Sequence, residues 1–218
     1  MSVIVIANQK GGCGKSTTAV HLARWLANRG SENRVCVVDA DAQRSSSIWL
    51  NALPAQEQPS EVEVIGDSDG ILDSVPEIAK AFDWVIVDCP GGILEVGRAA
   101  LLRADCVFVP IQPTGLDIRS AADSTKLIKQ AQSVRNGPPQ TVTFISRGKR
   151  NTKSKAMAQS ILEKLGFPVM KTVIHQKEDV AALFGKRTTA FDTKGRALSE
   201  AAREYDHLFT EAFEQWQI

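Results

Sequence analysis

Eight consecutive residues near the start of the chain have the types and the order that bind a chain of phosphates. They lie between an apolar run at residues 3–7 and a helix-like segment at 17–29. Glycines permit a tight turn whose backbone N–H groups point at phosphate oxygens, and the following helix N-terminus adds partial positive charge. The pattern predicts a nucleoside triphosphate site in which Lys15 reaches the β- and γ-phosphates and Ser16 supplies a hydroxyl to Mg²⁺. The eight residues are Lys10, Gly11, Gly12, Cys13, Gly14, Lys15, Ser16 and Thr17.

Two further segments place carboxylates directly after apolar, strand-like runs. Asp39 ends the run at 34–39 and Asp41 follows it, while Asp88 ends the run at 84–88. Ligands of parallel α/β sheets bind at the carboxyl ends of strands, so these acids are expected beside the phosphate-binding turn. Phosphoryl transfer needs neutralised charge and a positioned water, which acids and a metal ion supply. The simpler alternative for each acid is that it caps the next helix.

Strand-like and helix-like segments alternate along the whole chain. Strands are predicted at 3–7, 34–39, 62–65, 84–88, 106–111, 141–146 and 169–174. Helices are predicted near 17–29, 45–50, 71–82, 93–103, 117–134, 155–165, 180–185 and 198–216. Continuous Val/Ile strands separated by helices indicate a doubly wound α/β fold, with a mostly parallel sheet covered on both faces. No low-complexity linker divides the sequence, so residues 1–218 are expected to form a single domain.

Composition favours a cytoplasmic protein. The chain has neither an apolar run long enough to span a membrane nor the basic-then-apolar start of a signal peptide. Its four cysteines are scattered without a C-x-x-C pair, which indicates reduced thiols rather than a disulfide framework. The histidines lack metal-ligand spacing and are expected to be structural, and the aromatic residues near the C-terminus are expected to pack in the core.

Charge is distributed unevenly along a nearly neutral chain. The formal net charge is +1, yet residues 126–196 hold 15 Lys and Arg against 4 Asp and Glu. The bases form two clusters, at residues 147–155 and at 186–187. Clustered bases separated by small polar residues predict salt-sensitive contact with duplex phosphates. The cluster at 147–155 has no aromatic residue, which argues against stacking on single-stranded bases. The alternatives are a solvated loop and, for the loop at Arg147, an edge of the nucleotide base pocket. The predicted DNA-binding residues are Arg147, Lys149, Arg150, Lys153, Lys155, Lys186 and Arg187.

The turn at 10–16 resembles the deviant Walker A motif of the ParA/MinD ATPases. The first glycine of an ordinary P-loop is replaced by Gln9, and a second lysine, Lys10, stands at the entrance. The resemblance implies that Lys10 crosses a dimer interface to the partner's nucleotide. It likewise implies that Asp88 is the Walker B residue that orders Mg²⁺ through water. Asp41 matches the residue that polarises the attacking water, and Asp39 matches its neighbour in the Mg²⁺ and water network.

The sequence departs from the family pattern at three places. Ala42 and Cys89 stand where proline and threonine are usual, and Gly91 with Gly92 follows Pro90 where a second proline is common. None of these changes removes a charged group, so nucleotide binding is expected to persist. The property on which the changes bear is the rate of hydrolysis. The resemblance extends from the first strand to about residue 198.

The resemblance implies a partition ATPase of the short, plasmid ParA type, since the chain starts at the first strand without a helix-turn-helix. Lys10, Lys15 and Asp41 would be catalytic, and Ser16, Asp39 and Asp88 would hold the metal. The cofactors implied are ATP and Mg²⁺. The implied partners are a second copy of the chain, non-specific duplex DNA and a cargo-bound adaptor, either ParB-like or a small centromere-binding protein. Hydrolysis would be weak and stimulated by partner and DNA, and the ATP form would associate with the nucleoid.

Three alternatives remain at the level of sequence. A MinD-like ATPase would bind membranes, but the C-terminal segment 203–218 is net acidic and would be repelled by anionic lipid. An iron–sulfur reductase ATPase would need bridging cysteines, and Cys89 has no convincing second ligand. A metabolic P-loop ligase would not need Lys10.

Overall fold

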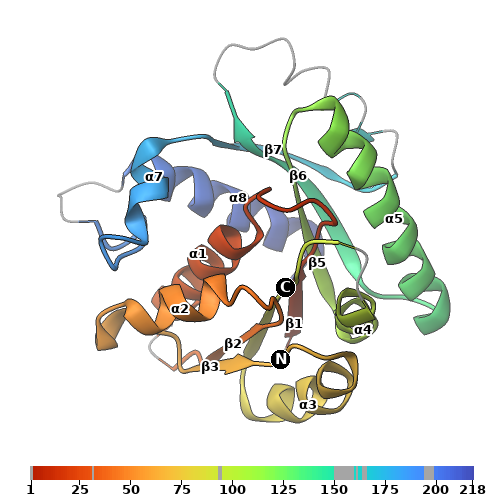
Figure 1. Cartoon of the computed structure of the whole chain (residues 1–218), viewed down its shortest axis with the longest axis horizontal. Coiled ribbons are helices and arrows are strands. Elements are labelled where there is room, and N and C mark those ends of the chain that lie inside the picture. Colours follow the sequence, from red (N-terminus) through yellow and green to blue (C-terminus); the bar gives the residue numbers. More distant parts are fainter. Residues whose placement is uncertain are drawn as a thin grey trace.

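A computed structural model describes residues 2–30, 32–92, 95–149, 160, 162–163, 166–193 and 199–218. Within these residues, seven strands form one sheet in the order β3-β2-β4-β1-β5-β6-β7, and every neighbouring pair is parallel (Figure 1). The strands are β1 (Ser2–Ile6), β2 (Val35–Asp39), β3 (Glu61–Val64), β4 (Trp84–Asp88), β5 (Cys106–Ile111), β6 (Gln140–Gly148) and β7 (Val169–His175).

Helices cover both faces of the sheet, as the sequence predicts. On one face lie α1, α2, α7 and α8, and on the other lie α3, α4 and α5 (Figure 1). Their bounds are α1 (Lys15–Asn28), α2 (Ser45–Ala52), α3 (Ser68–Ala81), α4 (Glu95–Arg103), α5 (Gly115–Arg135), α7 (Glu178–Leu183) and α8 (Glu200–Trp216). The predicted doubly wound α/β class is confirmed.

The central strand β1 shows why these runs are apolar throughout. Ile4 and Ile6 point into the core beneath α1 and α8, while Val3 and Val5 point into the core beneath α3, α4 and α5. Successive side chains of a strand face opposite sides, so a strand between two helical layers has no polar face. The same burial holds the carboxyl end of the strand, and the turn that follows it, in a fixed position.

The last helix protects the outer edge of the sheet. Both carboxylate oxygens of Glu211 accept backbone hydrogen bonds from β7, from Lys171 N at 2.7 Å and Thr172 N at 3.0 Å. Glu204 accepts a third from His175 N at 3.0 Å. On its other side α8 buries Phe209 and Trp216, among other residues, which confirms that the C-terminal aromatic residues pack in the core.

The observed element bounds differ from the predicted ones at a few places. Helix α3 begins at Ser68 rather than near residue 71, because the Asp67 side chain caps it by accepting a hydrogen bond from Gly70 N at 2.7 Å. Strand β6 continues to Gly148, so Arg147 lies within the strand and not, as predicted, in a loop after it. The helix predicted at 155–165 falls mostly outside the described residues.

Candidate functional site

The turn between β1 and α1 has the shape that the sequence predicts. Gly12 and Gly14 adopt positive φ angles of 74° and 98°, which residues with a Cβ rarely adopt. Helix α1 begins directly after Gly14, so its N-terminal N–H groups face the cavity above the turn. Lys15 is 6% exposed, and its Nζ donates to the Lys10 carbonyl oxygen at 3.1 Å. The loop is therefore folded around Lys15 in the form expected for a phosphate cradle.

The strand-end acids Asp39 and Asp88 lie side by side below the turn. The two residues are register partners on β2 and β4, and both are completely buried. Asp39 accepts hydrogen bonds from Ser47 N at 2.8 Å and Asp41 N at 3.1 Å. Asp41, two residues further along the chain, lines the cavity. The structure thus brings all three predicted acids to the same end of the sheet as the turn.

Asp88 has an unusual environment for a carboxylate. Neither of its oxygens has a hydrogen-bond partner among the described residues, and the hydroxyls of Ser16 and Ser46 face the carboxylate without completing a hydrogen bond to it. Burial raises the pKa of the Asp88 carboxyl to about 7, and the charge of Asp39 adds to the rise, whereas the two hydroxyls and Lys15 oppose it. A buried acid left unpaired in this way is costly unless a cation compensates it.

These residues fit a hydrated magnesium ion. Mg²⁺ prefers oxygen ligands and usually keeps several waters, binding through one or two carboxylates and the substrate phosphates. Ser16 offers a hydroxyl at the start of α1, and Asp88 offers two unpaired oxygens beneath it. The described residues contain no group of three His, Cys, Asp or Glu side chains arranged for a metal, so the donor set suits a phosphate-bound ion rather than an all-protein cage. Ser16, Asp39 and Asp88 are the candidates to hold it.

Neighbouring strand ends brace the turn through residues that the sequence analysis did not select. The Asn8 side chain accepts a hydrogen bond from Lys10 N at 3.1 Å and donates one to the Pro110 carbonyl oxygen at 2.7 Å. Gln112, after β5, donates to the Gly12 carbonyl oxygen at 2.7 Å. Both residues follow apolar strands at the active end of the sheet, which is the signal that could have identified them.

The loop after β4 packs directly against the turn. Gly92 N donates to the Gln9 carbonyl oxygen at 2.7 Å, and a Cβ added to Gly91 would lie 3.3 Å from the Gly11 Cα. This close approach of two backbones gives a physical reason for glycine at position 91, where the family commonly has proline.

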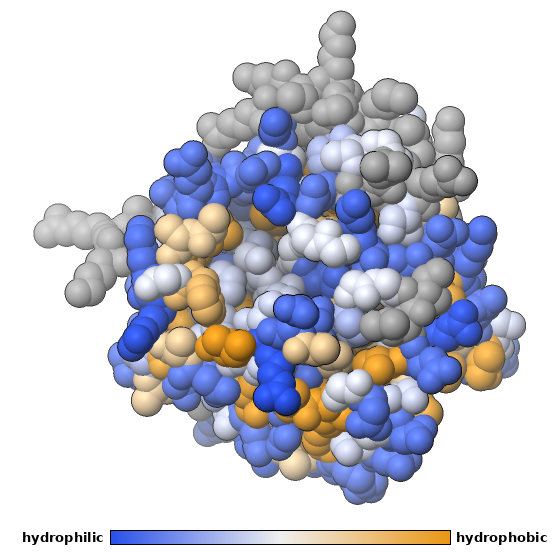
Figure 2. Space-filling model, viewed as in Figure 1, coloured by the Kyte–Doolittle hydropathy of each residue, from blue (hydrophilic) through white to orange (hydrophobic). Residues whose placement is uncertain are grey.

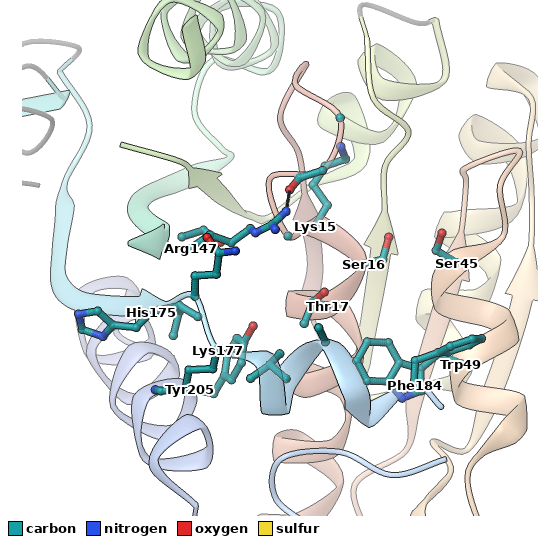
Figure 3. A pocket seen from close by; sticks show the side chains of 18 of the residues that line it. Lys15, Ser16, Thr17, Ser45, Trp49, Arg147, His175, Lys177, Phe184 and Tyr205 are labelled. Carbon is teal, nitrogen blue, oxygen red and sulfur yellow. Dashed lines mark hydrogen bonds between the residues drawn. The ribbon is translucent and has the colours of Figure 1, made fainter. Parts of the chain in front are cut away.

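A cavity of about 970 Å³ opens above the turn and extends along α7 to α8. Lys15, Ser16 and Thr17 form one wall, Trp49 and Phe184 lie at one end, and His175, Lys177 and Tyr205 lie at the other (Figure 3). His175 was expected to be structural, but it lines this cavity while its Nδ1 lies 2.8 Å from Glu204 Oε1.

The basic residues predicted to bind DNA do not share one environment. Lys149, Lys186 and Arg187 are exposed. Arg147 is also exposed, and both it and Lys149 line the cavity, where the Arg147 Nη1 donates to the Gly12 carbonyl oxygen at 2.9 Å. Arg150, Lys153 and Lys155 lie outside the described residues. Hydrophilic side chains cover much of the face drawn in Figure 2, and apolar ones are grouped in its lower part.

Comparison with known proteins finds a matching family model and similar sequences. Residues 4–190 match the model of the CobQ/CobB/MinD/ParA nucleotide binding domain. The protein ParA of Rhizobium radiobacter is 31% identical over 191 residues, which cover 84% of this chain and 82% of that protein. The maintenance of carboxysome distribution protein A of Halothiobacillus neapolitanus is 26% identical over 210 residues, 95% of this chain and 94% of that protein.

The fold is also similar to that of the MinD cell division protein of Aquifex aeolicus. The TM-score is 0.74 at 22% identity, and the match covers 97% of this chain and 98% of that one. The phosphate-binding turn, the paired acids and the seven-stranded parallel sheet therefore have a common explanation. The chain belongs to the CobQ/CobB/MinD/ParA family of nucleotide-binding domains, among its ParA/MinD ATPases.

Proposed function

We propose that this chain is a ParA-type partition ATPase, with one ParA-like nucleotide-binding domain over residues 1–218. ATP closes a dimer in which each subunit completes the other's site, and the dimer binds duplex DNA without sequence preference. A partner protein bound to the cargo stimulates weak hydrolysis and releases the dimer. ATP shifts the population toward the dimer only as far as the extra interactions in the dimer allow.

The observation that supports this proposal most is the contrast between the two lysines of the turn. Lys15 is buried and faces inward, whereas the Lys10 side chain is exposed. The Lys10 backbone is held on both sides, by Asn8 through its N–H and by Lys15 through its carbonyl oxygen. A rigidly held backbone with an outward-facing cation suits contact with phosphates bound by a second subunit.

In the proposed reaction the remaining site residues position the phosphates and a water. Lys15 and the backbone N–H groups of residues 11–17 bind the phosphates. Asp41 lines the cavity and, in this proposal, orients and polarises the attacking water. Bound Mg²⁺, near Ser16, Asp39 and Asp88, would neutralise charge that develops on the phosphates. Most of the catalysis is then positioning and electrostatics, which suits a slow, partner-stimulated enzyme.

The proposed DNA surface consists of exposed bases near the ends of β6 and α7. Among the described residues these are Lys149, Lys186 and Arg187, and the segment around them holds most of the chain's excess positive charge. Contacts of this type are made to phosphates, so they confer affinity without reading sequence.

The proposed cargo follows from the relatives. One is named ParA, and the other is named for maintaining carboxysome distribution. We propose a plasmid as the cargo, or another body that is positioned in the same way, with a ParB-like or small centromere-binding adaptor. The protein would then be cytoplasmic and would associate with the nucleoid in its ATP state.

The membrane and cluster alternatives have less support. Among the described residues, the helices are each too short or too polar to traverse a bilayer. The apolar face of α8 is buried in the core, so it is not available to insert into a lipid surface. Cys89 and Cys106 are buried, and burial raises the pKa of each thiol to about 12, which opposes the thiolate form that ligates iron.

The test is binding to random-sequence duplex DNA with ATP, with ADP and without nucleotide, over a series of salt concentrations. The wild type should bind only with ATP and lose affinity steeply as salt rises. Lys10→Ala should still bind ATP as a monomer but neither dimerise nor bind DNA, and Lys15→Ala should lose nucleotide binding itself. DNA binding that is absent at low salt with ATP, or that persists in Lys10→Ala, would contradict the proposal.

A further inference from the structure

The side chain of Arg147, one of the bases predicted to bind DNA, reaches the phosphate-binding turn. Its Nη1 donates to the Gly12 carbonyl oxygen at 2.9 Å. Figure 3 shows the side chain extending from the end of β6 toward the turn, on the side of the cavity where Lys15 lies.

The backbone conformation at Arg147 directs the side chain toward the turn. Ser146 is paired with Ile174 and Gly148 with His175, so Arg147 is an extra residue in β6, a bulge. Its φ angle is 53°, in the left-handed region that disfavours residues with a Cβ. Bulges next to functional sites redirect side chains, and strained backbone persists where its surroundings impose it.

The residues on either side of Arg147 hold the bulge in place. A Cβ added to Gly148 would lie 2.8 Å from Val173 Cγ1, so this strand position has no room for a larger residue. The Ser146 Oγ lies 2.8 Å from the position of a Cβ on Gly14, so the end of β6 packs against the turn itself. The direction of the Arg147 side chain is therefore set by packing between β6, β7 and the turn.

The present partner of Arg147 is neutral and can be replaced. Within the described ranges, no carboxylate lies within ion-pair distance of the Arg147 guanidinium. Lys15 is in the same situation, since its Nζ contacts the carbonyl oxygen of Lys10. Two cations thus converge on one turn, and each is bonded to a backbone carbonyl that an anionic oxygen would outcompete.

We propose that Arg147 is a further nucleotide-binding residue, a cation in the same subunit that contacts the terminal phosphates of a bound triphosphate. Its planar fork suits two phosphate oxygens. When it turns to the phosphates, the Gly12 carbonyl oxygen keeps its hydrogen bond from Gln112, so this acceptor is not left unpaired. The inference deepens the proposed function, because it rests on the nucleotide site but not on DNA binding or a dimer.

The experiment measures equilibrium affinities for Mg²⁺ with ATPγS and for Mg²⁺ with ADP, in the absence of DNA. Arg147→Ala should weaken ATPγS binding about 10- to 100-fold, as expected for the loss of a charge-assisted hydrogen bond, and ADP binding about threefold or less. Arg147→Gly should behave alike while its melting temperature stays level or rises, because glycine tolerates the left-handed backbone. Arg147→Lys should restore part of the preference for ATPγS.

Gln112→Ala is the matched control, since it removes the other donor to the same carbonyl without removing charge. It should change ATPγS and ADP affinity equally. Equal losses for both nucleotides in Arg147→Ala would mean that Arg147 only braces the turn, and would overturn the inference. Unchanged nucleotide affinities with weaker DNA binding would assign Arg147 to the DNA surface instead. Failure of the wild type to bind either nucleotide would contradict the proposed function as well.

Discussion

Asp39 and Asp88 are paired side by side on adjacent parallel strands, yet only Asp39 accepts backbone hydrogen bonds among the described residues. Asp39 accepts two backbone hydrogen bonds, from Asp41 and Ser47, whereas the Asp88 oxygens have no such partner among the described residues. The two acids therefore differ in the backbone donors that the fold provides. Burial raises the pKa of Asp88 to about 7, the charge of Asp39 adds to the rise, and no backbone hydrogen bond to Asp88 opposes it.

Replacing Asp88 by a neutral residue should stabilise the fold. The raised pKa of Asp88 means that the folded state holds a proton that the unfolded state has lost, so this group's contribution to stability falls as pH rises from about 4 to 7. Asp88→Asn should raise the free energy of unfolding at pH 8 by about 2–4 kcal/mol, measured by urea denaturation without nucleotide. It should also weaken the dependence of nucleotide binding on Mg²⁺. Lower stability of Asp88→Asn at pH 8 would show that the Asp88 charge is compensated.

The buried His21 should change the pH dependence of stability in the direction opposite to that of Asp88. Burial lowers the pKa of His21 to about 4, and its Nε2 accepts a hydrogen bond from Ala190 N at 3.2 Å, which requires the neutral ring. Between about pH 6.5 and 4 the unfolded state binds a proton that the folded state does not, so stability falls as pH falls. In wild type this loss is offset by Asp88.

The effect of His21 should therefore emerge in Asp88→Asn. That variant should lose about 2 kcal/mol of stability between pH 7 and pH 5. Adding His21→Gln should lower stability at every pH but flatten this dependence. A flat profile in Asp88→Asn alone would mean that His21 is protonated in the folded protein.

The contact between the loop after β4 and the turn should tolerate no side chain. Gly91→Ala places a Cβ 3.3 Å from the Gly11 Cα, so one backbone must move and nucleotide affinity should fall about tenfold. Gly97→Ala is the control, because nothing lies within 4 Å of its added Cβ and alanine favours its helix α4. Calorimetric titration compares the two variants. Equal nucleotide affinities for Gly91→Ala and Gly97→Ala would show that the loop after β4 can move to accommodate the added methyl group without disturbing the turn.

The exposed bases after α7 should contribute to DNA affinity through charge alone. Lys186→Ala and Arg187→Ala should each weaken binding to all duplex sequences equally. Each should also reduce the slope of log affinity against log salt by about one for every phosphate that the variant no longer neutralises. Lys80→Ala removes the same charge from exposed α3 on the opposite face of the sheet, and it should leave the slope unchanged. If Lys80→Ala lowers the slope as much, the effect is one of net charge.

The sequence predicts the fold and the centre of the site because both depend on short-range patterns. Apolar runs that end in Asp39 or Asp88 specify buried strands and place their acids at one edge, and the glycines before Lys15 specify the turn. The position of Arg147 depends instead on the pairing of β6 with β7 and on a bulge of one residue. That arrangement is set by packing between distant segments, so clustering of charge could not predict the hydrogen bond between Arg147 and the turn, and the DNA contact of Arg147 stays a prediction.

The carboxylates of α8 also limit how copies of this chain can join. Glu211 and Glu204 occupy three backbone N–H groups of β7 that a foreign strand would need. A filament that grew by continuing the sheet from molecule to molecule would have to break these bonds at each joint that involves β7. Any polymer of the ATP form is therefore expected to be held together by side-chain surfaces, with each sheet remaining the size that it has in one molecule.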